Sequence, residues 1–184
     1  MLQNFKFNDK EIAEILNNAI ILIDTREKDN FQTRLFNEYC ASCLIKTERT
    51  KLPYGDYAVK VPALPHLGIT REIFIPYSIE RKASLDELCI NLSKDDRQRF
   101  FNEFANAKAD GFKVHIVVFS NDYHDLITGN YRSQYGSLAL ENSLWSLHAK
   151  YDVPISYVKD INDAPRFIVK CLWGKLRSEL KHWH

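Results

Sequence analysis

Runs of apolar residues alternate along the chain with stretches in which apolar residues recur every three or four positions. The run Ala19–Ile23 is almost purely apolar and mostly β-branched, and it stops at Asp24. A second, largely apolar run covers Val114–Phe119. Strands buried on both faces of a sheet have this composition, with polar groups following where the strand ends. Both runs are therefore predicted to be central strands.

Further strands and helices follow from the same periodicities. Strand-like segments lie near 43–50, 55–62, 71–80 and 153–158. Helical periodicity is found at 8–18, 30–40, from Ser84 onward, 95–109, 137–150 and 161–181. Alternation of strands with helices predicts an α/β fold with helices on both faces of a sheet. Residues 62–70, with Pro62, Pro65 and Gly68, form the one obvious loop insertion.

Helix-capping signals support several of these boundaries. Asn8 is a plausible N-cap for the first helix, and the spacing of Ser84 to Glu87 resembles a capping box. Gly111 suits a helix C-terminus, and Pro165 stands near the start of the last helix, where proline is tolerated.

The length of 184 residues fits one domain, 1–184, with a core of about 20–170 and one helix at each end. The N-terminus has no apolar run behind a basic start, and no segment approaches the ~20 apolar residues that span a bilayer. We therefore expect a soluble, cytoplasmic protein without a membrane partner, located in the host cytoplasm if a phage encodes it.

The charge balance limits where nucleic acid could bind. The chain has 25 Lys and Arg against 24 Asp and Glu, a formal charge of +1. Proteins that bind DNA commonly carry a basic excess, because neutralising phosphates releases counterions. Any nucleic-acid surface must therefore be local, although bound metal cations would add positive charge that a sequence count omits.

Four cysteines are present, and Cys40 and Cys43 have CxxC spacing. No second CxxC pair or paired histidines complete a zinc tetrahedron. Buried, reduced thiols are therefore favoured over a metal or redox site. His115, within an apolar strand, is expected to be a hydrogen-bonded core histidine. Tyr131 and Tyr135 are expected to pack, with stacking on single-stranded bases as the alternative.

The candidate chemistry lies in an acidic residue followed by an E-x-K tripeptide. Asp56 follows Gly55, where a tight turn is permitted, and Glu80 and Lys82 flank Arg81. Alternation along a strand places Glu80 and Lys82 on the same face. Carboxylates can hold Mg²⁺ or Mn²⁺ for phosphodiester hydrolysis, with a lysine beside them. Taken alone, the pattern is equally compatible with a solvated strand end.

Neighbouring motifs add specificity. The chain carries in order Asp24-Thr25-Arg26-Glu27, Gly55-Asp56-Tyr57, Glu80-Arg81-Lys82 with Asp86, and Arg99-Phe100 with Glu103. Over about residues 20–170 this order resembles the XPF-type (ERCC4-domain-like) structure-specific endonuclease domain of the PD-(D/E)XK nuclease superfamily. The leucine expected directly after Asp86 comes one residue late, and loop 62–70 lengthens the interval between Asp56 and Glu80.

The resemblance implies a mixed central sheet with a restriction-endonuclease-like core and a site that uses Mg²⁺ or Mn²⁺. Asp56 and Glu80 would be metal ligands, with the Arg81 carbonyl as a candidate third ligand, and Lys82 would be the general catalyst. Asp24 would lie beside the metal, either as a ligand or as a carboxylate that supports the ligands. The residues that would orient the site or contact the phosphate backbone are Arg26, Glu27, Arg81, Asp86 and Arg99. A salt-bridge network bracing the sheet is an equal alternative for Arg26, Arg81 and Arg99.

The implied function is metal-dependent cleavage of DNA at branched or single/double-strand junctions, in DNA repair or recombination. Another PD-(D/E)XK enzyme, such as a junction resolvase or repair nuclease, and a non-catalytic DNA-binding scaffold subunit remain as alternatives. DNA is the expected partner, and a homodimer or a protein partner stays open. Without a helix-hairpin-helix or helicase motif, the chain is expected to be a stand-alone catalytic domain of the kind found in bacteria and phages.

Overall fold

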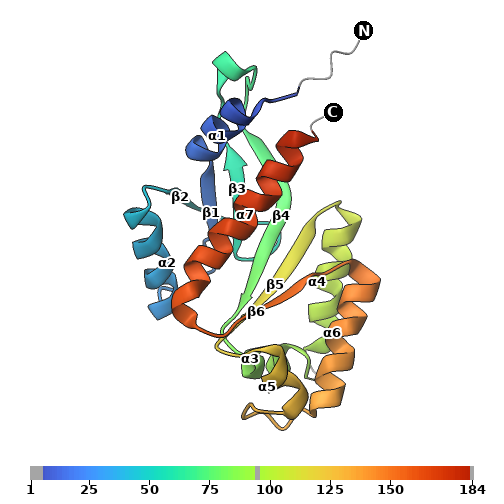
Figure 1. Cartoon of the computed structure of the whole chain (residues 1–184). Coiled ribbons are helices and arrows are strands. Elements are labelled where there is room, and N and C mark those ends of the chain that lie inside the picture. Colours follow the sequence, from blue (N-terminus) through green and yellow to red (C-terminus); the bar gives the residue numbers. More distant parts are fainter. Residues whose placement is uncertain (1–5, 94–95, 183–184) are drawn as a thin grey trace. The chain divides into compact units, whose positions relative to one another are not determined.

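The computed structural model describes residues 6–93 and 96–182 (Figure 1). Its six-stranded sheet has the order β2-β1-β3-β4-β5-β6. The strands are β1 (Ile20–Asp24), β2 (Lys46–Thr50), β3 (Tyr57–Val61), β4 (Ile73–Lys82), β5 (Lys113–Phe119) and β6 (Ile155–Val158). The helices are α1 (Asp9–Asn18), α2 (Phe31–Ser42), α3 (Leu85–Asn91), α4 (Arg97–Ala109), α5 (Tyr123–Thr128), α6 (Ser137–Tyr151) and α7 (Ala164–Lys181). The predicted α/β fold class with a mixed sheet is confirmed.

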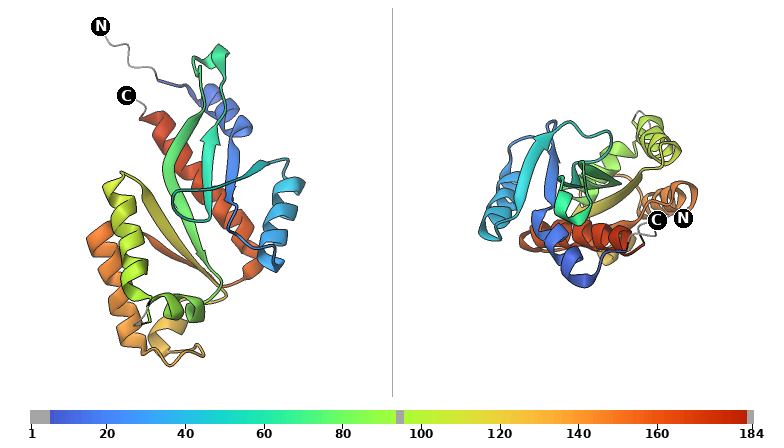
Figure 2. Two further views of the ribbon diagram at one scale, coloured as in Figure 1. Left: turned by 180° about the vertical axis from the view of Figure 1, so that it is seen from behind. Right: turned by 90° about the horizontal axis from the view of Figure 1, so that it is seen from above.

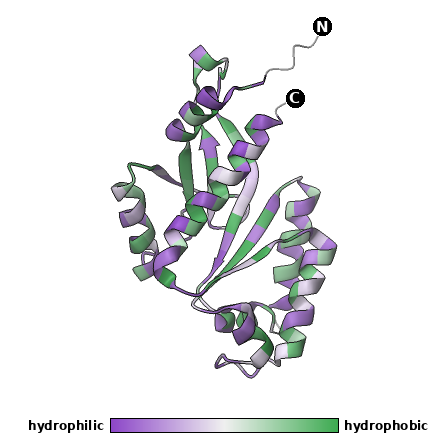
Figure 3. Ribbon diagram, viewed as in Figure 1, coloured by the Kyte–Doolittle hydropathy of each residue, from purple (hydrophilic) through white to green (hydrophobic). Residues whose placement is uncertain are grey.

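The first of two compact units holds the described residues up to Leu52, 57–77 and those from Pro165 onward. Within it, β1 pairs in parallel with β2 and antiparallel with β3. Every residue of β1 after Ile20 is buried, as the apolar run predicts, and β1 is correspondingly green in Figure 3. Helix α7 packs on the first half of β4, where the Tyr77 hydroxyl lies 3.0 Å from the Cys171 sulfur.

The second unit holds residues 53–56 and 78–164. It contains the end of β4, the parallel pair β5–β6 and helices α3 to α6. Figures 1 and 2 show α4 and α6 side by side, and Val114, Ile116 and Val118 of β5 share one apolar core with α3, α4 and α6. Tyr131 and Tyr135 pack against this core, as predicted.

The expected helix starts are confirmed at two caps. Asn8 forms a full capping box with Glu11, and the Ser84 hydroxyl accepts a hydrogen bond from the Glu87 amide (3.3 Å). Helix α7 begins at Ala164, since residues Ile161–Asp163 form a 3₁₀ turn instead. The predicted start of α4 at Asp95 lies outside the described residues.

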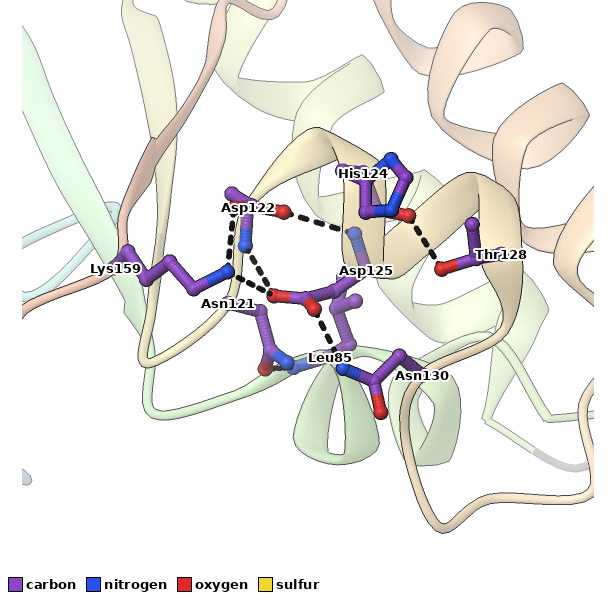
Figure 4. Close-up of polar contacts among 8 residues, drawn as sticks. All are labelled: Leu85, Asn121, Asp122, His124, Asp125, Thr128, Asn130 and Lys159. Carbon is purple, nitrogen blue, oxygen red and sulfur yellow. Dashed lines mark hydrogen bonds and ion pairs between the residues drawn. The ribbon is translucent and has the colours of Figure 1, made fainter.

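Helix α5 was not predicted from the sequence. Asp122 and Asp125 form a reciprocal capping box at its start, and Asn130 and Lys159 also contact the Asp125 carboxylate (Figure 4). The hydrogen bonds from the Asp122 amide and Asn130 lower the pKa of Asp125 to about 2. The carboxylate therefore stays ionised at neutral pH and joins α5, the segment at Asn130 and the residue after β6.

The prediction of buried cysteines holds for Cys40 and is wrong for Cys43, although both thiols are free. Cys43 is the C-cap residue of α2, where the chain leaves the helix towards solvent.

The single-domain prediction is untested and stays a prediction, as does the cytoplasmic location. None of the described helices combines the length and apolar character needed to cross a lipid bilayer.

His115 yields a prediction about acid stability. It is 7% exposed, and its Nε2 lies 2.9 Å from Ser156 Oγ. Burial, reinforced by the charge of Lys113, lowers the pKa of His115 to about 4. As the pH falls past 6.5, the ordinary pKa of histidine, the unfolded chain therefore takes up a proton at His115 before the folded chain does. Lowering the pH from 7 to 5 should reduce the free energy of unfolding by about 2 kcal/mol through this group.

His115→Gln should lack that component of the pH dependence, because glutamine does not titrate. Urea unfolding of both proteins at pH 7 and pH 5 measures the difference. The exposed His124→Gln is the control and should keep the wild-type dependence. A His115→Gln variant that loses as much stability in acid as wild type would contradict the prediction.

Candidate active site

Asp56 is fixed against the end of β4 through its backbone and its side chain. Its amide donates to the Ile79 carbonyl (2.8 Å), and its Oδ2 accepts a hydrogen bond from the Arg81 amide (2.7 Å). The Asp56 carboxylate therefore lies beside the backbone that separates Glu80 from Lys82.

Gly55 makes this approach possible. Its φ is +71°, and a Cβ added there would lie 2.6 Å from Ser78 Oγ and 3.0 Å from the Ile79 carbonyl oxygen. A side chain would therefore be both strained and crowded, so the turn before Asp56 requires glycine.

Gly55→Ala should lower the free energy of unfolding by about 3 kcal/mol, combining left-handed strain with overpacking. Gly111→Ala is a matched control, because Gly111 has φ +70° but nothing within 4 Å of an added Cβ. It should lose only about 1 kcal/mol. Denaturant unfolding measures both losses, and equal losses would show that crowding at Ser78 is not the cause. Adding Ser78→Gly to Gly55→Ala should recover part of the loss.

Glu80 and Lys82 lie on the same face of β4, as alternation predicts. Lys82 Nζ donates to Glu80 Oε1 at 2.7 Å. The Lys82 side chain is 7% exposed and the Glu80 side chain is 13% exposed. Lys82 Nζ also lies 5.3 Å from the centroid of the Phe100 ring in α4. The alternative of a solvated strand end therefore does not describe this pair.

The charge state of Lys82 is set by two opposing effects. Burial lowers its pKa, but the attraction and hydrogen bond of Glu80, with further attraction from Glu87 and Asp56, raise the pKa above its ordinary value. Lys82 is therefore a buried cation among three carboxylates.

Glu87 is a member of this group that sequence reasoning assigned only to helix capping. Its Oε2 accepts a hydrogen bond from the Ala83 amide (2.7 Å), which directs the carboxylate back towards the end of β4. The Ser84-x-x-Glu87 spacing is visible in the sequence. The spacing does not indicate that the Glu87 carboxylate also attracts Lys82.

Asp24 and Arg26 form a closed set of hydrogen bonds within the first unit. Asp24 is 1% exposed. Its Oδ1 accepts from the Arg26 amide (2.6 Å) and Nε (2.8 Å), and its Oδ2 accepts from Arg26 Nη2 (2.9 Å) and the Leu52 amide (2.7 Å). Burial raises the Asp24 pKa, but these hydrogen bonds outweigh it and lower the pKa overall. Each oxygen thus has two protein donors, an arrangement that favours a supporting carboxylate over a direct ligand.

The remaining predicted residues lie in several places. The Glu27 amide donates to the Asp24 carbonyl (3.2 Å), next to the Asp24–Arg26 pair. Asp86 accepts hydrogen bonds from the Arg132 and Ser133 amides, both 2.8 Å, and so fixes the segment before α6. Arg99 is 77% exposed and pairs with Asp96 at 2.9 Å, so its side chain faces solvent.

The residues around Lys82 suit a hard divalent cation by their chemistry. Asp56 and Glu80 supply carboxylate oxygens, and the intervening Arg81 supplies a backbone carbonyl. Mg²⁺ and Mn²⁺ prefer such oxygen ligands. Among the described residues, no group of three or more His, Cys, Asp or Glu side chains is arranged to hold a metal ion. A cation here would therefore rely on two carboxylates, the carbonyl and water.

Comparison with known proteins agrees with this fold. The family model of the ERCC4 domain matches residues 23–171. The chain therefore belongs to the ERCC4 domain family. None of the curated proteins matches the chain significantly.

Two solved structures share the fold. XPF from Aeropyrum pernix aligns with a TM-score of 0.56 at 18% identity, covering 83% of this chain and 59% of that chain. XPF from Aeropyrum pernix in complex with DNA gives a TM-score of 0.56 at 18% identity, covering 84% of this chain and 63% of that chain. The chain thus spans about three fifths of the length of each.

Proposed function

We propose that this protein hydrolyses phosphodiester bonds of DNA with Mg²⁺ or Mn²⁺, using Asp56, Glu80 and Lys82. The observation that carries the proposal is the largely buried Glu80–Lys82 pair, with the Asp56 carboxylate held at the amide between them. A purely structural ion pair at a strand end would not need a second carboxylate anchored there. Membership of the ERCC4 domain family supports a nuclease-type activity.

Asp56 and Glu80 would hold the cation, together with the Arg81 carbonyl. When bound, the cation supplies an activated water and positive charge beside the scissile phosphate. Lys82 would orient that water or neutralise charge developing on the phosphate, and its three carboxylate neighbours keep it protonated for the second task. The attraction of the Glu87 carboxylate would help to hold Lys82 in place.

Asp24 and Arg26 would act by positioning rather than by contact with the reacting atoms. Two hydrogen bonds, from the Leu52 amide to Asp24 and from Arg26 Nη2 to the Leu52 carbonyl, join the end of β1 to the backbone at Leu52, shortly before Asp56 in the sequence. Glu27, Arg81, Asp86 and Arg99 remain proposed as residues that orient the site or contact the phosphate backbone.

DNA with branched or single/double-strand junctions is the proposed substrate. The resemblance to structure-specific endonucleases supports it, as does the likeness to an XPF that was solved with DNA. Another PD-(D/E)XK nuclease with a different DNA preference is the nearest alternative. A non-catalytic scaffold is disfavoured, because the two carboxylates and the lysine are all retained and brought together.

The test is cleavage of end-labelled flapped duplex, four-way junction and linear duplex in Mg²⁺, in Mn²⁺ and with EDTA. The proposal expects cuts near the branch of the flapped duplex, much slower cutting of linear DNA, and none with EDTA. Preference for the four-way junction would indicate a resolvase. Cutting that persists in EDTA, or no cutting of any substrate with either metal, would overturn the proposal.

A further inference from the structure

A surface pocket between α4 and α6 carries a cation that the proposed cleavage site does not use. Its volume is about 450 Å³, and it is lined by Leu92, Arg97, Tyr135, Ala139, Asn142, Ser143 and Ser146. All of these residues belong to the second unit. Besides Arg97, four of the described lining residues carry a neutral hydroxyl or amide group, and none of the described lining residues carries a carboxylate.

Arg97 is held rigidly in this pocket, which we call the Arg97 pocket. Its Nη1 donates to Ser143 Oγ (2.8 Å) and to the Tyr135 hydroxyl (3.1 Å). Its guanidinium carbon lies 4.7 Å from the centroid of the Phe101 ring. Ser143 is 3% exposed, and its own hydroxyl proton goes to the Ala139 carbonyl (2.7 Å). Ser143 Oγ therefore acts as an acceptor and points a lone pair at Arg97.

None of the described residues supplies a carboxylate that balances the charge of Arg97. In the parts of the chain that the structure describes, no carboxylate lies within ion-pair distance of Arg97. Arg97 differs in this respect from Arg26, Arg99 and Arg132, each of which forms an ion pair with an aspartate. A partly buried guanidinium that contacts only neutral hydroxyls and a ring keeps its full attraction for an external anion.

We propose that the Arg97 pocket binds a phosphate of a nucleic-acid strand, a contact separate from the phosphate that is cut. This inference rests on the proposed function, because that function supplies the strand. The planar fork of arginine matches phosphate oxygens, and the Asn142 and Ser146 side chains add neutral hydrogen-bonding groups that suit a phosphodiester. Such a contact positions the strand without reading its bases.

Helix α4 connects this pocket to the proposed cleavage site. Phe100 lies under Lys82, and the next residue, Phe101, lies under Arg97. The two neighbouring rings thus hold one cation each, so the helix fixes the spacing between the two points at which a strand would be gripped.

The test is built on Ser146, which can be changed without touching the contacts of Arg97. Ser146→Asp places a negative charge in the pocket, and Ser146→Asn is its neutral, equal-sized control. Binding of a labelled flapped duplex is measured by fluorescence anisotropy in EDTA, so that cleavage plays no part. Ser146→Asp should raise the dissociation constant about five- to tenfold in low salt, while Ser146→Asn stays within about twofold of wild type.

A salt series adds a second readout. Arg97→Gln should weaken binding and reduce the slope of log affinity against log salt by about one, because one phosphate contact is lost. Arg166→Gln, exposed on α7, removes the same charge elsewhere and should leave the slope unchanged. Circular dichroism shows whether Arg97→Gln folds. If it does not fold, the comparison of DNA affinity between Ser146→Asp and Ser146→Asn tests the proposal. Equal affinities for Ser146→Asp and Ser146→Asn would overturn the proposal.

Inorganic phosphate and a nucleoside monophosphate serve as competing probes. If these bind wild type but not Ser146→Asp, while strand affinity is the same in both proteins, the pocket is a free-phosphate site and the strand assignment is overturned. If Ser146→Asp binds DNA more weakly than Ser146→Asn but wild type cuts no DNA with Mg²⁺ or Mn²⁺, the Arg97 pocket is supported and the proposed function is overturned. If wild type cuts DNA but the two Ser146 variants bind equally well, the proposed function is supported and the Arg97 pocket is overturned.

Discussion

Replacing Glu80 with glutamine is expected to lower the cleavage rate of a flapped duplex by at least about 10³-fold while the chain stays folded. Glutamine keeps the size of the side chain and can still accept a hydrogen bond from Lys82, which now reaches Glu80 Oε1 at 2.7 Å. It loses the negative charge that a divalent cation requires. Single-turnover cleavage in Mg²⁺ measures the effect, and Mn²⁺ calorimetry should show a corresponding loss of binding.

Glu38→Gln, an exposed site on α2, is the matched control and should cut at the wild-type rate. Thermal unfolding shows whether both variants retain the fold. Cleavage by Glu80→Gln within a few-fold of wild type would remove Glu80 from the site. Asp56→Asn tests the second carboxylate in the same way and should give a loss of similar size.

Replacing Lys82 with methionine is expected to affect both stability and cleavage. Asp56, Glu80 and Glu87 all attract the buried Lys82 ammonium, so its removal leaves carboxylates without their cation. The free energy of unfolding should fall by about 3 kcal/mol, as when one partner of a buried pair is deleted. Cleavage should fall by about 10²–10³-fold, because the ammonium that would orient the water or offset charge on the phosphate is lost. Millimolar Mn²⁺ should raise the melting temperature of this variant more than that of wild type, since the metal replaces the lost charge.

Lys113→Met provides the comparison for this second result. Lys113 pairs with Asp152 at 2.6 Å, but both side chains are exposed, and surface pairs contribute at most about 1 kcal/mol. Its substitution should therefore change stability little and cleavage not at all. A Lys82→Met protein that cuts DNA normally would show that the Glu80–Lys82 pair only stabilises the strand.

Most of the fold could be predicted because burial produces simple patterns. The central strands β1 and β5 are buried on both faces and therefore lack polar alternation. Helix α5 escaped prediction for the opposite reason. It has only six residues, and Asp125 and Leu126 are its buried ones, so it shows no apolar stripe. Its signal was the capping box at Asp122 and Asp125, a polar feature that hydrophobic periodicity does not detect.

The site could be predicted in part. The strand period placed Glu80 and Lys82 together, but the roles of Glu87 and Arg97 depend on contacts between elements. In α4 the motif pointed to Arg99, whereas helical geometry gives the inward position to Arg97, three residues before the buried Phe100. A residue two positions from Arg97 lies on a different side of a helix, so Arg99 faces solvent.

The adjacent rings of Phe100 and Phe101 have a consequence for the products of the proposed cleavage. Consecutive residues of a helix cannot change their separation. Lys82 over one ring and Arg97 over the other are therefore held at a fixed distance from each other. If a strand is gripped at Arg97 and cut beside Lys82, the number of nucleotides between the two points is constant. Fragment lengths would then be set by distance from the gripped phosphate and would not vary with base sequence.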